Sequence, residues 1–547
     1  MKKLLFVFVL LAFCLSEISG QTKRVKNVIL MIPDGTSWAT VSSARWYQRY
    51  LDPSKQHLFI DPYLCGSVLT FSVDEPIGDS APTTSCYMTG VPSRAGYVAT
   101  YPPVDTKNDL VPQDPNRAYQ PLMTVLEAAR IFNKMSVGLV FTCEFPHATP
   151  ADCSAHSYDR GKYDWIAPQM VHNGLDVVIG GGIKYLIQEH QNYLKKENYG
   201  VYLDDIQGFR SHKGNKMWSL FGKKDMPYDL DRDEARYPSL AEMTAKAIEK
   251  LSANKNGFFL MVEGSKIDWA AHANDPIGMI TDMLAFDKAF GVAAEFAKKN
   301  GETVVVAVPD HGNSGISIGN QRCYENHIVS LEGLFKNVSN YKVTAEKLVE
   351  ILKKTEPSEI KNVFKKYTDI SLKDSLVGVL LSSEDYAKST LSATERMKGT
   401  NLKKTVTSIM NDNTCFGFTT GGHTGEEVFL AVCAPEKNRL SGMVTNVELN
   451  HYLKSILAVE DLEKYTADYF AKHTEVFKNY KWKIVKDDKK ITLEVEKDKN
   501  TKLVVKPNSN IVLLNDKEIR LNSVVVYVDK NDTFYLPRIE IAGYGLK

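Results

Sequence analysis

The sequence predicts an α/β fold, a three-layer αβα sandwich around a largely parallel sheet. Short, continuously apolar runs such as Lys26–Ile32 and Thr303–Val308 are typical of strands that are buried on both faces. Helical stretches such as Ser239–Leu251 and Ile280–Lys299 separate these runs, which favours parallel strands with helices on both sides of the sheet. Ligands of such sheets bind beyond the carboxyl ends of the strands, so we look for function where the apolar runs end.

The first twenty residues are predicted to be a secretory signal, because two lysines precede the apolar run Leu4–Leu15 and small residues lie before a cleavage point near Gly20. Lipid attachment at Cys14 is the less favoured alternative, since a bulky phenylalanine precedes it. The rest of the 547 residues, with 43% hydrophobic and 24% charged residues overall, is typical of a globular protein. We therefore expect an exported protein, periplasmic or secreted.

Charge and hydropathy exclude two classes of partner. Removing residues 1–20 leaves 65 basic and 65 acidic residues, so no basic surface for nucleic acid is indicated. No later apolar run is long enough to span a bilayer. An odd number of cysteines remains, which leaves at least one free thiol and leaves the disulfide pairing open: Cys65, Cys86, Cys143, Cys153, Cys323, Cys415 and Cys433.

Acidic residues stand where the predicted strands end. Asp34 follows Lys26–Ile32, Glu263 follows Gly257–Val262, and Asp310 follows the strand that begins at Thr303. Asp34 alone also fits an ordinary Asp-Gly turn, but the joint pattern places all three carboxylates in one crevice. Two further buried strands are predicted at Ser136–Thr142 and Asp176–Ile179.

The stretch Gly78–Ser85 (GDSAPTTS) is interpreted as the turn that carries a nucleophile. Ser80 is expected to be the N-cap of a helix over Ala81–Thr89, which Gly90 ends. A serine hydroxyl at that position lies at the positive end of the helix dipole, which favours an alkoxide and binds anions. An ordinary helix cap is the alternative interpretation.

Carboxylates and imidazoles nearby have the spacing of a metal site. Asp268 and His272 are in an i,i+4 relation, and together with His311 and His423 they suit zinc. The carboxylates of Asp34, Glu263, Asp268 and Asp310 would raise one another's pKa values unless cations were present. Three divalent cations would convert this charge of −4 to +2, which suits the dianion of a phosphate monoester, and the planar fork of Arg160 could bind two of its oxygens. Five other histidines are predicted to be solvated surface residues: His57, His172, His190, His212 and His473.

The chain is divided into three parts after the sequence patterns. Residues 21–478 are expected to form the catalytic domain, with a helical cap or excursion at 331–410 that includes helices at Thr344–Lys354, Pro357–Lys366 and Ser389–Met410. An apolar strand at Glu427–Cys433 and helices at Thr445–Leu457 and Leu462–Phe477 complete this domain. From 479 to 547, short alternating strands joined by polar turns indicate a small all-β module.

Seven ordered motifs resemble those of the alkaline phosphatase family, over roughly Lys26 to Phe477: NVILMIPDG, GDSAPTTSCYMTG, HATPADCSAHSYDR, DVVIGGG, FFLMVEGSKIDWAAHAND, VVVAVPDHGNSG and GGHTGEEVFLA. The resemblance implies that Ser80 is the nucleophile that becomes phosphoserine, that Arg160 binds the phosphate, and that Asp79 orients Arg160. It also implies phosphate monoesters and inorganic phosphate as ligands. A homodimer is one assembly that we consider.

The resemblance further implies two zinc ions and a third metal, usually magnesium. The first zinc would be held by Asp268, His272 and His423, and the second by Asp34, Asp310 and His311 together with Ser80. Asp34, Thr149 and Glu263 would hold the third metal. His147 stands where some members have an aspartate at the third site, which would favour zinc or cobalt over magnesium there. Trp269 stands where other members carry lysine or histidine near the phosphate, which leaves Arg160 as the one assigned positive side chain.

The predicted function is therefore that of an exported, zinc-dependent phosphomonoesterase. The related sulfatases share a Ser-x-Pro core, but their motif needs an arginine where this chain has Thr84. A phosphodiesterase of the same superfamily is a second alternative. The third is a catalytically silent protein that binds a surface through residues 479–547, although Ser80, Arg160 and the zinc ligands are all present.

Overall fold

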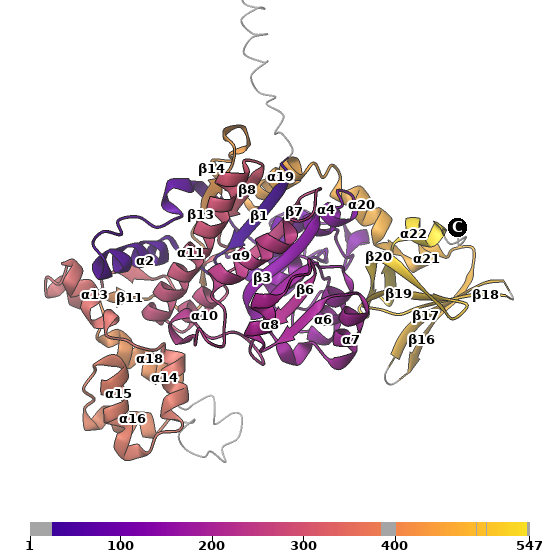
Figure 1. Ribbon diagram of the computed structural model, residues 1–547. Coiled ribbons are helices and arrows are strands. Elements are labelled where there is room, and N and C mark those ends of the chain that lie inside the picture. Colours follow the sequence, from indigo (N-terminus) through magenta and orange to yellow (C-terminus); the bar gives the residue numbers. More distant parts are fainter. Residues whose placement is uncertain (1–24, 384–400, 488–489, 499, 544–547) are drawn as a thin grey trace, which may run out of the picture.

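The computed structural model describes residues 25–383, 401–487, 490–498 and 500–543 (Figure 1). The predicted signal segment with Cys14, and the first part of the predicted helix Ser389–Met410, lie outside the described residues. Within the described part of the chain, no helix combines the length and the apolar character needed to cross a bilayer.

A ten-stranded sheet forms the centre of the molecule, which confirms the predicted fold class. Nearly all neighbouring strands are parallel, whereas β13 runs antiparallel to both β2 and β8. In spatial order the strands are β14 (Gly442–Thr445), β2 (Leu64–Leu69), β13 (Val428–Cys433), β8 (Thr303–Ala307), β1 (Asn27–Ile32), β7 (Phe258–Glu263), β3 (Ser136–Glu144), β4 (Val177–Gly181), β6 (Met217–Leu220) and β5 (Gly200–Leu203).

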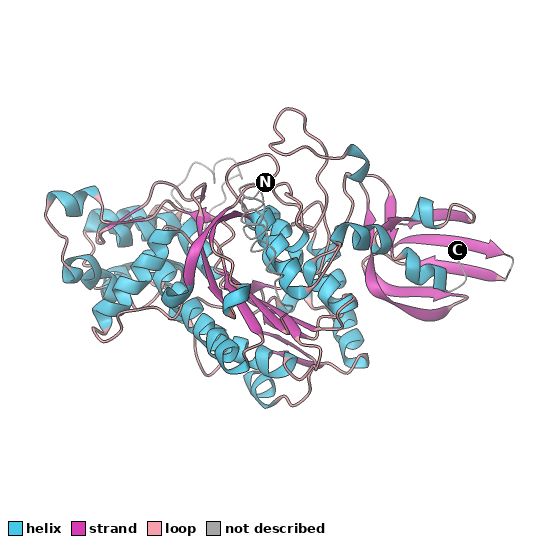
Figure 2. Ribbon diagram, turned by 90° about the horizontal axis from the view of Figure 1, so that it is seen from above, coloured by secondary structure: helices cyan, strands magenta, loops and turns pink. Residues whose placement is uncertain are grey.

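Strand β1 shows why its sequence is apolar throughout. Its even-numbered side chains, from Val28 to Ile32, belong to one apolar core, whereas Ile29 and Met31 belong to a second core on the other face. Helices cover both cores (Figure 2). The first lies against α3 (Ser80–Thr89), α4 (Val125–Ile131), α6 (Tyr163–His172) and α19 (Asn446–Leu457), and the second against α2 (Trp38–Leu51), α9 (Leu240–Leu251) and α11 (Pro276–Asn300).

The strand register brings the predicted acidic residues to one edge. In the parallel pairing of β1 and β7, Ile32 lies opposite Glu263, and in the pairing of β1 and β8, Met31 lies opposite Ala307. Because these strands end together, Asp34, Glu263 and Asp310 all emerge at the same carboxyl edge of the sheet.

Two predicted helices differ from the observed ones. Helix α11 begins at Pro276 rather than Ile280, because the side chain of Asp275 caps it by accepting a hydrogen bond from the Gly278 amide. The predicted helix Leu462–Phe477 is wrong as a single element: α20 (Leu462–Tyr469) ends, and strand β15 (Ala471–Lys472) follows because it pairs with β21 (Thr533–Leu536).

A helical lobe projects from one side of the core (Figure 1). A disulfide between Cys323 and Cys415 joins the segments before and after the lobe, which supplies the pairing that the sequence left open. In the chain-entropy description, closing a loop of roughly 100 residues stabilises the fold by about 4–5 kcal/mol. The described helices of the lobe include α14 (Ala345–Leu352), α15 (Ile360–Thr368), α16 (Asp374–Leu381) and α18 (Leu402–Asp412), and α13 (Leu331–Ser339) precedes them beside α2.

A seven-stranded antiparallel sheet occupies the other side of the core (Figures 1 and 2). It packs closely on the α/β domain, since Val524, Val526 and Tyr535 belong to the same apolar core as strand β1. In spatial order its strands are β15, β21, β20 (Lys517–Val528), β19 (Ser509–Leu514), β18 (Thr501–Val505), β17 (Lys490–Asp498) and β16 (Lys481–Asp487).

Histidine burial is not what the sequence predicted at two positions. His190 and His473 are buried, at 8% and 2% exposure, rather than solvated. Nδ1 of His473 accepts a hydrogen bond from the Phe534 amide of β21. The Phe534 amide replaces water as the hydrogen-bond partner of His473. This partner is 61 residues away in the sequence, so the local pattern did not predict the burial.

Candidate metal and phosphate site

Ser80 is the first residue of the fully buried helix α3, and Asp79 rather than Ser80 is the N-cap. The predicted cap is thus displaced by one residue, while Gly90 ends the helix with φ +78° as expected. The Ser80 hydroxyl oxygen is 3.4 Å from Asp34 Oδ1 and 3.4 Å from His311 Nε2. The nucleophile candidate therefore sits at the helix N-terminus and in contact with two predicted metal ligands.

Asp34 reaches this position through a turn that only glycine allows. Gly35 has φ +60°, and a Cβ there would lie 2.3 Å from Asp268 Oδ1. The Gly35 amide donates to Asp310 Oδ1 at 3.0 Å, so the turn also fixes the second carboxylate. Asp34 and Gly35 do form a turn, which was the alternative interpretation of Asp34, and this turn also places Asp34 beside Ser80.

Three histidines are oriented in the same way. In each, Nδ1 lies near a backbone carbonyl: His272 to Gly421 at 2.8 Å, His311 to Gly312 at 3.0 Å, and His423 to Gly78 at 3.0 Å. Nδ1 must carry the proton in order to donate to a carbonyl, so Nε2 is unprotonated and has a free lone pair. The Nε2 atoms of His272 and His423 face each other at 3.2 Å. Two lone pairs repel at that distance unless a cation lies between them, so the arrangement fits zinc.

Among the residues that the structure describes, His, Cys, Asp and Glu side chains form four groups of three, and within each group the ligand atoms all lie within 4.8 Å of one another. The first group matches the predicted first zinc, and the second includes Asp268 where Asp310 was predicted. The hydroxyl of Thr149 is buried without a hydrogen-bond partner among the described residues. The groups are Asp268, His272 and His423; Asp34, Asp268 and His311; Asp79, His311 and His423; and Cys143, His147 and Glu263.

The carboxylates of the site are buried close to one another, which disfavours their ionised forms. Burial raises the pKa of Asp34 well above its ordinary value, and the charges of Asp310, Asp268 and Glu263 raise it further. Burial, followed by the charge of Asp310, raises the pKa of Glu263 to about 8. Asp34 Oδ2, Asp310 Oδ2 and Glu263 Oε1 are buried without a hydrogen-bond partner among the described residues. Bound divalent cations would satisfy these oxygens and restore the ionised state.

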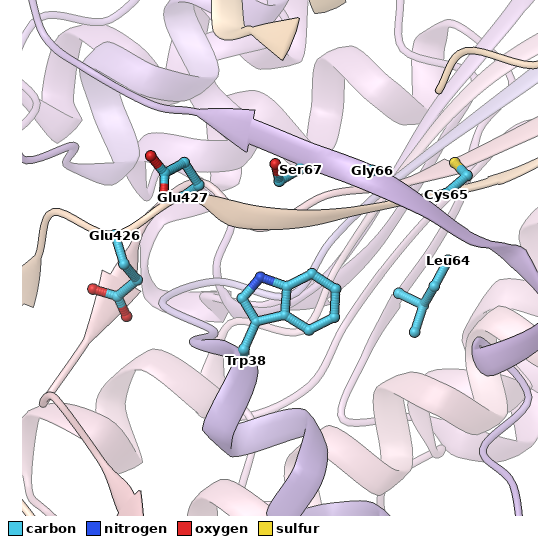
Figure 3. A pocket seen from close by; sticks show the side chains of 7 residues that line it. All are labelled: Trp38, Leu64, Cys65, Gly66, Ser67, Glu426 and Glu427. Carbon is cyan, nitrogen blue, oxygen red and sulfur yellow. The ribbon is translucent and has the colours of Figure 1, made fainter. Parts of the chain in front are cut away.

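A chain of polar side chains that the sequence analysis missed supports Asp268. Asn313 Nδ2 donates to Asp268 Oδ1 at 2.6 Å, the Asn313 amide donates to Ser37 Oγ, and Ser37 donates to Glu426 at 2.6 Å. Asn313 lies within the motif VVVAVPDHGNSG, so the motif itself was the available signal. Glu426 also lines a hollow of about 570 Å³ over β2 and β13, where Trp38 faces the strands (Figure 3).

Arg160 and Asp79 form a second centre next to Ser80. Arg160 Nη1 donates to both carboxylate oxygens of Asp79, at 3.0 and 3.2 Å, and Arg160 Nη2 lies 3.3 Å from His147 Nε2. Burial acts to raise the pKa of Asp79, but Arg160 and the nearby histidines outweigh burial and lower it. Asp79 is thus paired with the Arg160 guanidinium.

Trp269 lies beside this centre, with its ring centroid 5.9 Å from that of His147. Lys266 and Lys224 stack on it at 4.0 and 5.2 Å, so positive charges other than Arg160 approach the site. Lys266 is also paired with Asp225, which offsets its charge.

The C-terminal sheet holds the loop that carries Arg160. On one side of Arg160, the Tyr158 hydroxyl donates to Asp529 at 2.6 Å, and on the other side the Lys162 ammonium donates to Asp529 at 2.9 Å. One carboxylate from the end of β20 therefore brackets the predicted phosphate-binding residue.

Replacing Asp529 by alanine is expected to weaken inhibition by inorganic phosphate while leaving the protein folded. Partly exposed ion pairs contribute about 0–1 kcal/mol, so the inhibition constant should rise by up to about fivefold. Competitive inhibition assays with matched thermal melts measure both effects. An unchanged inhibition constant at an unchanged melting temperature would show that Asp529 does not position Arg160.

A pocket of about 560 Å³ adjoins the metal-ligand side of the site. Its wall combines Trp269 and His272 with Phe418 and with Lys403 and Lys404 of helix α18. Helix α18 of the helical lobe therefore borders the candidate site.

The sequence model of the alkaline phosphatase family matches residues 25–459, which is most of the chain. The chain belongs to this family. Alkaline phosphatase 3 of Bacillus subtilis is 32% identical over 446 residues, which cover 79% of this chain and 88% of that protein. The repressible alkaline phosphatase of Saccharomyces cerevisiae is 30% identical over 528 residues, which cover 87% of this chain and 89% of that protein. Members of the alkaline phosphatase family are phosphoric monoester hydrolases, so the enzyme class predicted from the motifs is confirmed.

The fold comparison agrees with the family assignment. The crystal structure of Thermus thermophilus alkaline phosphatase superposes with a TM-score of 0.68 at 22% identity, covering 81% of this chain and 93% of that chain. At this identity the likeness establishes the fold, and the roles of individual residues are argued from their geometry.

Proposed function

We propose that this chain is an exported, metal-dependent phosphomonoesterase that acts through a phosphoserine at Ser80. The observation that carries the proposal is the shared orientation of His272, His311 and His423, whose Nε2 atoms turn toward the carboxylates around Ser80. Such a donor set suits two zinc ions, and His147, Thr149 and Glu263 near Asp34 suit a third metal, magnesium or, given the imidazole, zinc or cobalt.

The reaction divides into two displacements at phosphorus. Arg160, oriented by Asp79, holds two non-bridging oxygens of the phosphate and aligns phosphorus with Ser80. The Ser80 hydroxyl loses its proton to solvent, which its place at the start of α3 favours, and its oxygen forms the new P–O bond. The bond from phosphorus to the leaving oxygen breaks, and that oxygen takes up a proton from water to give the alcohol. Water then attacks phosphorus from the vacated side, and inorganic phosphate leaves as Ser80 is regenerated. When bound, the metal ions stabilise negative charge on the attacking and leaving oxygens.

The alcohol would leave toward the pocket beside Trp269 and His272, because the opposite side of Ser80 is filled by buried helix α3. The mixed aromatic and basic wall of this pocket is compatible with leaving groups of varied chemistry.

Parallel assays of a generic aryl phosphate, the matching aryl sulfate and a phosphate diester, each with added zinc, test the reaction class. We expect the monoester to be hydrolysed fastest by a wide margin. Faster turnover of the sulfate or the diester would assign the chain to the corresponding alternative. Absence of turnover on all three would favour the silent binding protein.

Arg160→Ala is expected to weaken phosphate binding and slow turnover without unfolding the protein. Two charge-assisted hydrogen bonds to phosphate would be lost, at about 1.5–3 kcal/mol each, which corresponds to at least about a hundredfold loss in kcat/KM. Steady-state kinetics and phosphate inhibition measure the change. If inhibition by phosphate is the same in the variant, Arg160 is not the phosphate clamp.

Export is proposed from residues 1–20, and the Cys323–Cys415 disulfide is compatible with an oxidising compartment. Sequencing the N-terminus of the mature protein would locate the cleavage. Lipid attachment at Cys14 and a homodimer remain predictions of the sequence.

A further inference from the structure

One buried thiol faces the predicted third metal site, and the catalytic scheme leaves it unused. Cys143 lies near the end of strand β3, and its Sγ is 3.4 Å from Glu263 Oε2. Ser265 fixes this part of the strand, because its Oγ accepts hydrogen bonds from the Thr142 and Cys143 amides at 3.2 and 3.1 Å. The sulfur is thus held on the side of Glu263 by the backbone around it.

The neighbouring donors are complementary to a cation. Oε1 of Glu263 and Oγ1 of Thr149 are buried and find no hydrogen-bond partner among the described residues. Cys143, His147 and Glu263 each offer a ligand atom within 4.8 Å of the others. Buried polar atoms without partners are costly, so the unpaired Glu263 oxygen in this group points to a ligand that completes it.

The sulfur–oxygen distance matches a shared metal. With a zinc–sulfur bond of about 2.3 Å, a zinc–oxygen bond of about 2.0 Å and tetrahedral angles, the two ligand atoms would be about 3.5 Å apart. The observed separation of 3.4 Å agrees with this value. A hydrogen bond from the thiol to Glu263 gives a similar distance, so the two interpretations must be separated by experiment.

We propose that Cys143 is a thiolate ligand of the third metal site, which with His147 and Glu263 makes that site select zinc or another borderline ion over magnesium. The inference rests on the proposed function and deepens it. On binding, the thiol proton is released to solvent and a sulfur–metal bond forms, with no change of oxidation state. Thiolate and imidazole are ligands of borderline metals, whereas magnesium takes oxygen ligands.

The test compares the full-length protein with Cys143→Ser and with the matched control Cys433→Ser. Cys433 is also a buried free cysteine at the end of a central strand, β13, but it belongs to none of the four donor groups. Each protein is loaded with cobalt(II), whose thiolate complexes absorb strongly in the near ultraviolet. The absorption band reports the sulfur–metal bond without any turnover.

We expect the band in the unaltered protein and in Cys433→Ser, and its loss in Cys143→Ser. Zinc affinity at the third site should fall at least about tenfold in Cys143→Ser, with magnesium binding there instead. A band that persists in Cys143→Ser, or is absent from the unaltered protein, would overturn the assignment and leave the thiol as a hydrogen-bond donor to Glu263.

A second measurement covers the case in which Cys143→Ser does not fold. X-ray absorption at the zinc edge of the unaltered, fully loaded protein should show a sulfur shell at about 2.3 Å. Nitrogen and oxygen shells alone would refute the proposal. Failure of the proposed function is distinguishable, since a protein that shows the sulfur bond yet hydrolyses no phosphate monoester retains the ligand assignment and loses the enzymatic one.

Discussion

Exhaustive removal of metal ions is expected to reduce phosphate monoester hydrolysis by at least about 10⁴-fold, which corresponds to roughly 5.5 kcal/mol of transition-state stabilisation. The protein residues alone cannot supply this stabilisation. Asp34, Asp268 and Asp310 add negative charge around Ser80, where the reaction brings in an anionic substrate. Without cations the site would repel the phosphate that it has to bind.

Dialysis against a chelator, followed by elemental analysis and assay, measures this effect. Zinc should restore activity and calcium should not, because the three imidazole Nε2 atoms suit zinc, whereas calcium prefers an all-oxygen site. Full activity in a protein shown to be free of metal would refute the metal assignment.

Metal removal should also make stability fall as pH rises. In the metal-free protein the pKa values of Asp34 and Glu263 are raised above those of the unfolded chain, Glu263 to about 8. Between the ordinary carboxylate range and about pH 8, these two groups therefore bind more protons in the folded state than in the unfolded state, and their contribution to the free energy of unfolding decreases with pH. Thermal melts of metal-free protein across this range should show a falling midpoint that added zinc abolishes. The same pH profile with and without zinc would show that bound metal does not relieve these carboxylates.

Ser80→Ala is expected to reduce kcat by at least about 10³-fold, since loss of a nucleophile within a catalytic unit costs up to about 10⁶. Stability and metal content should change little, because the contacts of the Ser80 hydroxyl are long, at 3.4 Å, and the histidine ligands are untouched. Residual slow hydrolysis would come from direct attack of water on a phosphate that Arg160 still holds.

The matched control is Ser85→Ala, on the same buried helix, whose hydroxyl has no hydrogen-bond partner in the described structure. That variant should keep its activity. Equal losses in the two variants would mean that α3 tolerates no change and that Ser80 has no special role.

The fold was largely predictable because burial on both faces makes a central strand apolar throughout, as in β1. The direction of a strand, in contrast, was not predictable from its sequence. The run that becomes β13 is apolar in the same way as its parallel neighbours, yet it is antiparallel to β8, and no local pattern distinguishes the two. Edge strands such as β5 are only half-buried, so their sequences lack the continuous apolar signal.

The site was predictable to the level of which residues converge, since Asp34, Glu263 and Asp310 each follow a strand at the same edge. Sequence spacing does not determine which residues would bind the same cation, because that depends on side-chain geometry. Asp268, for example, belongs to one donor group with His272 and to another with Asp34. Long-range support was also invisible in sequence, because Ser37 and Glu426 are 389 residues apart. A single thiol such as Cys143 has no spacing pattern, so its approach to Glu263 emerged only from the structure.

Trapping the covalent intermediate tests the role of Ser80 most directly. The water that completes the second displacement must lose a proton, so mildly acid pH should slow hydrolysis of the phosphoserine while the serine ester itself is stable to an acid quench. After incubation with inorganic phosphate and quenching, mass spectrometry should find one phosphate on the peptide that contains Asp79, Ser80 and Ala81, and none in Ser80→Ala. Phosphate on Thr83, Thr84 or Ser85 instead, or an unmodified peptide from a protein that is active and metal-loaded, would contradict a phosphoserine at Ser80.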